Sequence, residues 1–259
     1  MGYPRPYNKR LPSVRNSMLG RALRFIYGVY ASVVVIVVIF VLFCPLIIIA
    51  PTLALRRTIG RLCVRTALAL VGVPFRVQGL ENLPLGTAVV VANHSSYFDG
   101  LVLTAALPSR FTFMVKQGAA AWPYIGLVIK RMGVRFINRV SKREGAVQTL
   151  RLIRDLKDGM SLAVFAEGTF KSQPGLLPFQ KGAFAIAAKA GVPVVPVAIR
   201  GTRKLLGANG RLLDWTSIEI RILPPITPDA STPPAVEALR DTARAAVLAA
   251  IGEPDLATS

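Results

Sequence analysis

An uncharged stretch from Phe25 to Leu55 constrains this chain more than any other feature. It contains no Lys, Arg, Asp or Glu, and its centre, Ser32 to Ile49, consists almost wholly of Val, Ile, Leu and Phe. About 20 apolar residues are enough to cross a bilayer as a helix, and this stretch is longer. It is too long for the core of a signal peptide, and no small-residue cleavage site follows it. The stretch therefore predicts a retained membrane anchor.

The topology of this anchor has two solutions, because basic residues flank it on both sides and positive charge favours the cytoplasmic face. One is a single span. The other is a re-entrant hairpin bent near Pro45 and Pro51, where proline breaks the helical hydrogen-bond ladder. A buried core hairpin is disfavoured, because the stretch has no polar face. Arg57, Arg61 and Arg65 then recur at helical spacing, which predicts an interfacial helix over 56–73 with its arginines on anionic head groups.

Beyond Pro74 the pattern alternates between strands and helices, which predicts an α/β fold with a mainly parallel mixed sheet flanked by helices. This domain is preceded by the hydrophobic membrane helix or helical hairpin. We expect strands at 75–79, 87–92, 111–115, 134–137, 162–165, 192–199 and 218–223, and helices at 97–107, within 123–131, and at 142–157, 181–190 and 235–251. We divide the chain into a basic segment (1–24), an anchor with an interfacial helix (25–73), a catalytic domain (74–225) and a C-terminal helix and tail (226–259).

Composition limits the partners of the chain. It carries 32 Lys and Arg against 13 Asp and Glu, a formal charge of +19, which implies an anionic partner. Hydrophobic residues make up 53% of the chain, so a membrane surface fits this charge better than nucleic acid does. No nucleic-acid-binding module is present in the sequence. Cys44 and Cys63 form no C-x-x-C pair, so neither a disulfide framework nor a metal site is expected.

The chain has one histidine, His94, and Asp99 follows it at short range after an apolar strand-like run. Imidazole titrates near neutral pH and is the usual side chain for proton transfer, and a carboxylate can orient it. A purely structural function is also open, because Ser96 and Asp99 fit a capping box at a helix start. The two functions are compatible, since a cap would fix Asp99 in place.

A second polar turn, Glu167 to Thr169, also follows an apolar strand-like run. In parallel α/β sheets, ligands bind beyond the carboxyl ends of the strands. Both polar turns lie at such ends, so we expect them to form one site.

Four blocks in a fixed order resemble the glycerolipid acyltransferases, the family that includes the 1-acyl-glycerol-3-phosphate acyltransferases. The first block, Asn93 to Asp99, matches the family's His-x4-Asp motif. The others are Lys116 with 122–126 and 135–139; 165–169 with 177–179 and 181–184; and 192–197. One block alone is a weak signal. All four in order, behind an apolar N-terminal segment, are a specific one.

By this resemblance, His94 is the general base that takes the proton from an acceptor hydroxyl, and Asp99 orients its imidazole. The acceptor oxygen attacks the thioester of acyl-CoA or acyl carrier protein, without a covalent acyl-enzyme and without a further cofactor or metal. The resemblance implies acceptor binding by Glu167, Gly168 and Thr169, positive charge for a phosphate from Lys116 and Arg139, and an acyl or acceptor pocket shaped by Val194 and Pro196.

The third block departs from the family at Phe170, where an arginine associated with the acceptor phosphate is usual. An aromatic ring cannot make a bidentate phosphate contact, and the neighbouring Lys171 is a point charge. Either Lys171, Arg139 or Lys181 holds the phosphate instead, or the acceptor is another lysolipid or an acylated amino-acid lipid.

We therefore expect a membrane-bound O-acyltransferase that acts on a lyso-glycerolipid, with 1-acyl-glycerol-3-phosphate as the first candidate acceptor and phosphatidic acid as its product. The expected partners are membrane lipids, acyl-CoA or acyl carrier protein, and the lysolipid. The expected location is the cell membrane, with the catalytic domain on the cytoplasmic face. A different acceptor, or a non-catalytic basic protein of the membrane surface, is the alternative.

Overall fold

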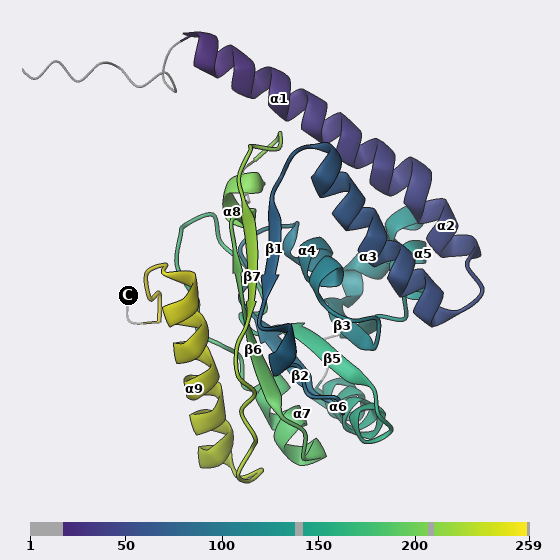
Figure 1. Cartoon of the computed structure of the whole chain (residues 1–259). Helices are drawn as coiled ribbons and strands as arrows, with labels where there is room; N and C mark the ends of the chain where they lie inside the picture. Colours follow the sequence, from purple (N-terminus) through teal and green to yellow (C-terminus); the bar gives the residue numbers. More distant parts are fainter. Residues whose placement is uncertain (1–17, 138–141, 207–209, 258–259) are drawn as a thin grey trace, which may run out of the picture.

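A mixed β-sheet forms the centre of the protein. The computed structural model describes residues 18–137, 142–206 and 210–257, and within them seven strands follow the order β1-β7-β6-β2-β5-β3-β4 (Figure 1). The strands are β1 Phe75–Gln78, β2 Val89–Ala92, β3 Phe111–Lys116, β4 Arg135–Ile137, β5 Ser161–Phe165, β6 Val194–Arg200 and β7 Ile218–Ile222. Neighbouring strands run parallel, except for the antiparallel pair of β6 and β7. The predicted fold class is confirmed.

Strand β2 lies at the middle of the sheet, and all four of its residues are fully buried. Such continuous apolar runs are typical of strands that helices cover on both faces. Strand β2 pairs with β5 on one side and with β6 on the other, so Ala92 lies opposite both Phe165 and Val197. The segments that follow β2 and β5 therefore leave the sheet side by side at its carboxyl edge.

Helices cover both faces of the sheet and form two hydrophobic cores. One core joins the sheet to α1 Met18–Ile36, α3 Leu53–Leu70 and α4 Asp99–Ala106. The other joins it to α6 Lys142–Lys157, α7 Gly182–Ala190 and α9 Pro233–Ile251. The shorter helix α5 Pro123–Arg131 packs against α2 Cys44–Ile49. Because helices cover both faces of the sheet, a ligand site can form only at its edges.

The apolar N-terminal stretch forms a helical hairpin with α3. Helix α1, a π-helical segment Val37–Phe43 and α2 are continuous, and α3 then runs back beside them (Figure 1). The turn contains Pro51, whereas Pro45 lies in the first turn of α2, directly after the π-helical segment. Proline lacks an N–H, and the wider π turn accommodates it without ending the helix. The bend is therefore at the second of the two prolines.

Two of the three arginines that we expected to face anionic head groups, Arg57 and Arg65, instead bind the protein backbone. Arg57 is half-buried and donates to the carbonyls of Ser109 and Met132, at 2.9 and 3.0 Å. Arg65 donates to the carbonyl of Ala105 at 3.0 Å. Both therefore bind the adjoining backbone, because a buried carbonyl needs a donor that the apolar surroundings do not offer.

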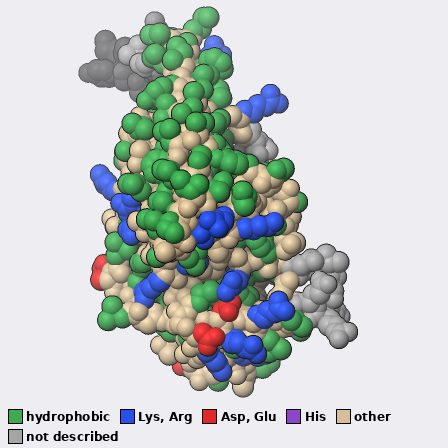
Figure 2. Space-filling view, turned by 90° about the vertical axis from the view of Figure 1, so that its right-hand side faces the viewer, with side chains coloured by type: hydrophobic (Ala, Val, Ile, Leu, Met, Phe, Trp, Pro, Cys, Tyr) green, Lys and Arg blue, Asp and Glu red, His purple; other side chains and the backbone are tan. Residues whose placement is uncertain are grey.

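The outer face of the hairpin is apolar and uncovered. Its most exposed large side chains include Leu19, Leu23, Phe25, Ile26, Val33, Val41 and Ile49. Figure 2 shows hydrophobic side chains gathered over this part of the molecule, with most of the lysines and arginines of that view below them. Among the described residues one helix, Met18–Ile49, is long and apolar enough to cross a membrane. An exposed apolar face of this kind marks an interaction surface.

Candidate active site

The loops after β2 and β5 lie together, and Asp99 organises the first of them. Asp99 is fully buried, and its Oδ2 lies 2.8 Å from Nδ1 of His94. The same oxygen accepts the backbone N–H groups of Ser95 and Ser96, at 2.5 and 2.8 Å. A carboxylate at Nδ1 favours the tautomer that carries the proton there, which leaves the lone pair on Nε2. The arrangement therefore prepares His94 to accept a proton.

Only one of the two hydrogen bonds of the capping box predicted for Ser96 and Asp99 is formed. Asp99 accepts the backbone N–H of Ser96, as the box requires. The Ser96 hydroxyl instead accepts the N–H of Phe98 at 3.1 Å and donates to the carbonyl of Leu206. The loop is thus held both by its own helix and by the segment after α8 Thr202–Leu205.

Glu167 joins the two loops. Its Oε1 accepts the backbone N–H of His94 at 2.6 Å, and its Oε2 accepts the N–H of Leu177 at 2.9 Å. Burial raises the pKa of Glu167 to about 7, although the N–H groups of His94 and Leu177 oppose this shift. Because both oxygens are occupied and the side chain is only 4% exposed, Glu167 supports the loops rather than presenting a free carboxylate to a ligand.

Two polar residues that the sequence analysis gave no function also fix the His94 loop. Asn93 is buried and clamps the backbone of Ile199, accepting its N–H at 2.7 Å and donating to its carbonyl at 3.0 Å. The Ser95 hydroxyl lies 3.1 Å from that of Thr202. The signal for Asn93 was its position directly after a buried strand, where an amide can replace the missing ladder bonds.

Aromatic rings surround the imidazole. Phe165 stacks on His94 with ring centroids 4.3 Å apart and planes 16° apart. Phe170 lies tilted against the same ring at 4.6 Å, and Tyr97 meets Phe170 edge-on at 4.9 Å. The residue that departs from the family pattern thus packs directly on the candidate base. The sequence analysis did not identify Phe165 or Tyr97 as site residues.

A cavity of about 450 Å³ opens beside His94. Its lining includes Lys116, Gly168, Thr169 and Phe170. Of the residues expected to bind the acceptor, the structure therefore brings Lys116, Gly168 and Thr169 to His94. The cavity is mainly apolar, with one lysine at its rim.

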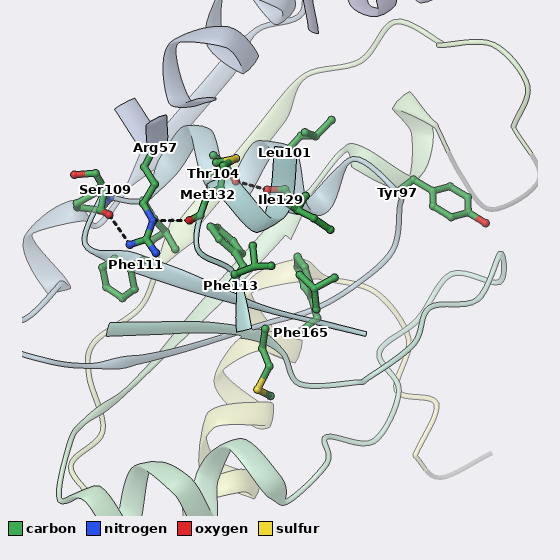
Figure 3. A pocket seen from close by; sticks show the side chains of 16 residues that line it. Arg57, Tyr97, Leu101, Thr104, Ser109, Phe111, Phe113, Ile129, Met132 and Phe165 are labelled. Carbon is green, nitrogen blue, oxygen red and sulfur yellow. Dashed lines mark hydrogen bonds between the residues drawn. The ribbon is translucent and has the colours of Figure 1, made fainter. Parts of the chain in front are cut away.

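A second, apolar cavity of about 240 Å³ adjoins the first. The two share Tyr97, Gly100, Met114, Val115 and Phe165 in their linings. Figure 3 shows its lining side chains, with Tyr97 and Arg57 at opposite ends. An apolar cavity of this kind suits a hydrocarbon chain, because few polar groups line it.

The other predicted site residues lie elsewhere. Lys171 is exposed and outside both cavity linings, and Lys181 pairs with Glu237 of α9. Val194 and Pro196 are buried inside β6 and line neither cavity. Val194 pairs with Val89 at the start of β2, the end of the strand away from His94. Arg139 falls outside the described residues.

Metal ligands do not gather in the described part of the chain. No three His, Cys, Asp or Glu side chains lie there in a group that could hold a metal ion. Cys44 and Cys63 are both free and buried.

Comparisons with known proteins identify acyltransferases that are similar to this chain. Residues 74–200 match the family described as Acyltransferase. The chloroplast 1-acyl-sn-glycerol-3-phosphate acyltransferase of Brassica napus is 39% identical over 58% of this chain and 44% of that protein. The 1-acyl-sn-glycerol-3-phosphate acyltransferase alpha of Mus musculus is 31% identical over 73% of this chain and 67% of that protein. The chain spans less than half the length of the plant relative.

A solved structure shares the fold. The 1-acyl-sn-glycerophosphate acyltransferase PlsC of Thermotoga maritima matches with a TM-score of 0.71 and 22% identity, over 89% of this chain and 97% of that one. The sequence match includes both loops of the site, and the structural match extends over most of the chain. The chain therefore belongs to the glycerolipid acyltransferase family.

Proposed function

We propose that this protein transfers a fatty acyl group from a thioester to the free hydroxyl of a lyso-glycerolipid at His94. The observation that carries the proposal is the pair of His94 and a fully buried Asp99, 2.8 Å apart, beside the first of two joined cavities. A base of this kind needs a fixed tautomer and an open second nitrogen, and the Asp99 contact favours both.

The reaction needs only groups that this site and its substrates supply. Nε2 of His94 takes the proton of the acceptor hydroxyl while the hydroxyl oxygen bonds to the thioester carbonyl carbon. The tetrahedral adduct collapses, its carbon–sulfur bond breaks, and the thiolate leaves with the proton from His94. Asp99 stabilises the imidazolium that exists between the two steps. No side chain becomes acylated, so no serine or cysteine nucleophile is needed.

The first candidate acceptor is 1-acyl-glycerol-3-phosphate, because the relatives named above carry this name. Lys116 supports it, since its positive charge lies at the cavity beside His94. Phe170 favours a second candidate class, an acceptor without a phosphate at that point, because the ring occupies the space next to the base. The donor is acyl-CoA or an acyl carrier protein, and the apolar cavity of about 240 Å³ would hold an acyl chain.

The N-terminal hairpin would hold the active site at the membrane that contains its lipid substrates. We propose that the uncovered apolar face of Met18–Ile49 enters the membrane, with the catalytic domain on the cytoplasmic side. The exposed side chains of this face support the proposal, since transfer to lipid stabilises apolar surface by about 25 cal/mol per Å². Flotation of the purified chain with anionic vesicles, which Leu23→Glu and Phe25→Glu should abolish, tests the docking.

The activity is tested with the purified full chain in detergent. Acyl-CoA or acyl carrier protein is offered with a panel of phosphorylated and unphosphorylated lysolipids, and transfer of labelled acyl chains is measured. His94→Ala should abolish transfer, while Asp241→Asn on the exposed side of α9 serves as the control. Vesicle binding with no transfer to any acceptor would instead support the non-catalytic membrane-surface protein.

A further inference from the structure

The chain after α9 pairs with the loop that carries Phe170. The N–H of Leu176 donates to the carbonyl of Pro254 at 2.9 Å, and the N–H of Leu256 donates to the carbonyl of Leu176 at 3.0 Å. We call residues 253–257 the tail segment and residues 168–177 the acceptor loop. The tail segment lies outside residues 74–200, the part that matches the family. Two segments about 80 residues apart are thus joined like neighbouring strands.

A first arginine fastens the tail segment to the acceptor loop from α8. Nη2 of Arg203 lies 2.9 Å from Oε2 of Glu253. Nη1 of the same guanidinium donates to the carbonyls of Lys171 and Gln173, at 2.7 and 3.0 Å. Oε2 of Glu253 also accepts the N–H of Gly175 at 2.8 Å. Carboxylate and guanidinium together therefore bind three backbone groups of the loop, all by charge-assisted hydrogen bonds.

A second arginine repeats this arrangement from α9. Arg244 binds both carboxylate oxygens of Asp255, with Nη1 lying 3.0 Å from Oδ2. Its Nη2 donates to the carbonyl of Leu176 at 2.9 Å, and its Nε donates to the carbonyl of Leu177 at 3.2 Å. The side chains of Arg203 and Arg244 are only 16% and 13% exposed. Water therefore screens these pairs less than it screens pairs on an open surface.

Leu256 adds an apolar contact at the same place. A Cβ on Gly175, whose φ is +136°, would lie 2.4 Å from Cγ of Leu256. Only glycine fits beneath this side chain and adopts that backbone conformation without strain. The acceptor loop is thus shaped to receive the tail segment.

The acceptor loop is connected to His94, the candidate base, in two ways. The N–H of Leu177 donates to Oε2 of Glu167, and Oε1 of Glu167 accepts the N–H of His94. On the other side, Lys171 follows Phe170, whose ring lies 4.6 Å from that of His94. Anything that lets the acceptor loop shift would therefore move both the support and the neighbour of the imidazole.

We propose that the tail segment positions the active site, with Glu253 and Asp255 acting through Arg203 and Arg244 to hold the acceptor loop against the His94 loop. This inference rests on the proposed acyl transfer at His94. The four charged residues are positioning residues and do not touch the substrate. Misplacing reacting groups by about 1 Å can lower a rate by about 100-fold, so this support matters to turnover.

The test uses a double variant that carries both Glu253→Gln and Asp255→Asn. The control is Asp241→Asn, an equivalent change on α9 that does not touch the loop. Turnover and KM are measured, and amide hydrogen exchange is followed by mass spectrometry. We expect kcat to fall by about 10- to 100-fold. Exchange in 168–177 should be faster by about 10-fold, with exchange in β2 and β5 unchanged, which shows that the sheet is still folded.

A chain cut after Gly252 should behave like the double variant. Unchanged kcat and KM in both, or lower kcat with unchanged exchange in the acceptor loop, would overturn the inference. If the unsubstituted chain shows no transfer, the proposed function fails instead. Exchange in the acceptor loop then still decides whether the tail segment holds it.

Discussion

Oε1 of Glu167 lies 2.6 Å from the backbone nitrogen of His94, which joins two loops that leave neighbouring strands. A buried carboxylate that accepts two backbone N–H groups fixes the distance between those loops. Through this contact, Glu167 supports the loop that carries His94. Gly168, Thr169 and Phe170 line the cavity beside His94, where we propose that the acceptor binds.

Asp99→Asn should abolish most of the activity with the fold retained. The neutral amide oxygen is a weaker acceptor for the three donors that the carboxylate oxygen binds, and a neutral amide cannot stabilise the imidazolium. We expect kcat to fall by about 100- to 10,000-fold. Steady-state kinetics beside the exposed control Asp158→Asn checks this. Equal kcat in the two variants would show that Asp99 has only a structural function.

Glu167 should make stability depend on pH. Burial raises its pKa in the folded chain to about 7, whereas a free Glu titrates near about 4.3. The folded state therefore binds more protons than the unfolded state between these values. Its contribution to the free energy of unfolding is complete below about pH 4 and is lost as the pH rises through about 7, and it amounts to at most about 4 kcal/mol.

The matching experiment measures the melting temperature at pH 5 and pH 8. Glu167→Gln removes this titration, so its melting temperature should change less between the two pH values than that of the unsubstituted chain. The variant should also be less stable at both, because the amide NH2 cannot accept the N–H of His94 or Leu177. The same pH difference in both proteins would show that Glu167 does not titrate in this range.

Lys116→Gln should selectively weaken the binding of phosphorylated acceptors. Lys116 and Lys171 are both exposed, but only Lys116 lines the cavity beside His94. A lost phosphate contact should raise KM for 1-acyl-glycerol-3-phosphate by about 10-fold, with little change for an unphosphorylated lysolipid. Lys171→Gln is the matched control. A larger effect of Lys171→Gln, or equal loss with both acceptor classes, would contradict this assignment.

Thr104→Phe should shorten the preferred acyl chain. Thr104 lies on α4 and lines the apolar cavity of about 240 Å³, so a phenyl ring there would fill space that a long chain needs. We expect kcat/KM to fall about 10-fold or more for a long acyl donor and to change little for a short one. Competition between donors of two chain lengths measures the ratio directly. Unchanged selectivity would place the acyl chain elsewhere.

The sequence predicted the elements that periodicity determines. The helix 142–157, the helix within 123–131 and the strand that ends at Phe165 match the structure, because their apolar patterns reflect burial. The helix 142–157 and the strand share one core, and the helix 123–131 packs against α2. The pairing of β2 with β5 then brings His94 and Glu167 together at one edge. The order of polar turns along the chain was enough to anticipate this.

Other features depend on contacts that no local pattern contains. The pairing of Leu176 with Asp255 links distant segments, so the ordered tail segment could not be inferred from its own composition. Lys181 has a basic side chain at a suitable point of the third block, yet Glu237 of α9 binds it. Val194 and Pro196 belong to a matching block but are buried within β6, where the burial of strands on both faces leaves no open cavity.

The most direct test of the account is single-turnover acyl transfer by His94→Gln, with thermal melting followed in parallel. Glutamine keeps a polar side chain of similar length but cannot take a proton from the acceptor. We predict that transfer slows by at least about 100-fold while the melting temperature stays close to that of the unsubstituted chain. Transfer at the original rate by a folded His94→Gln protein would contradict the assignment of His94 as the base.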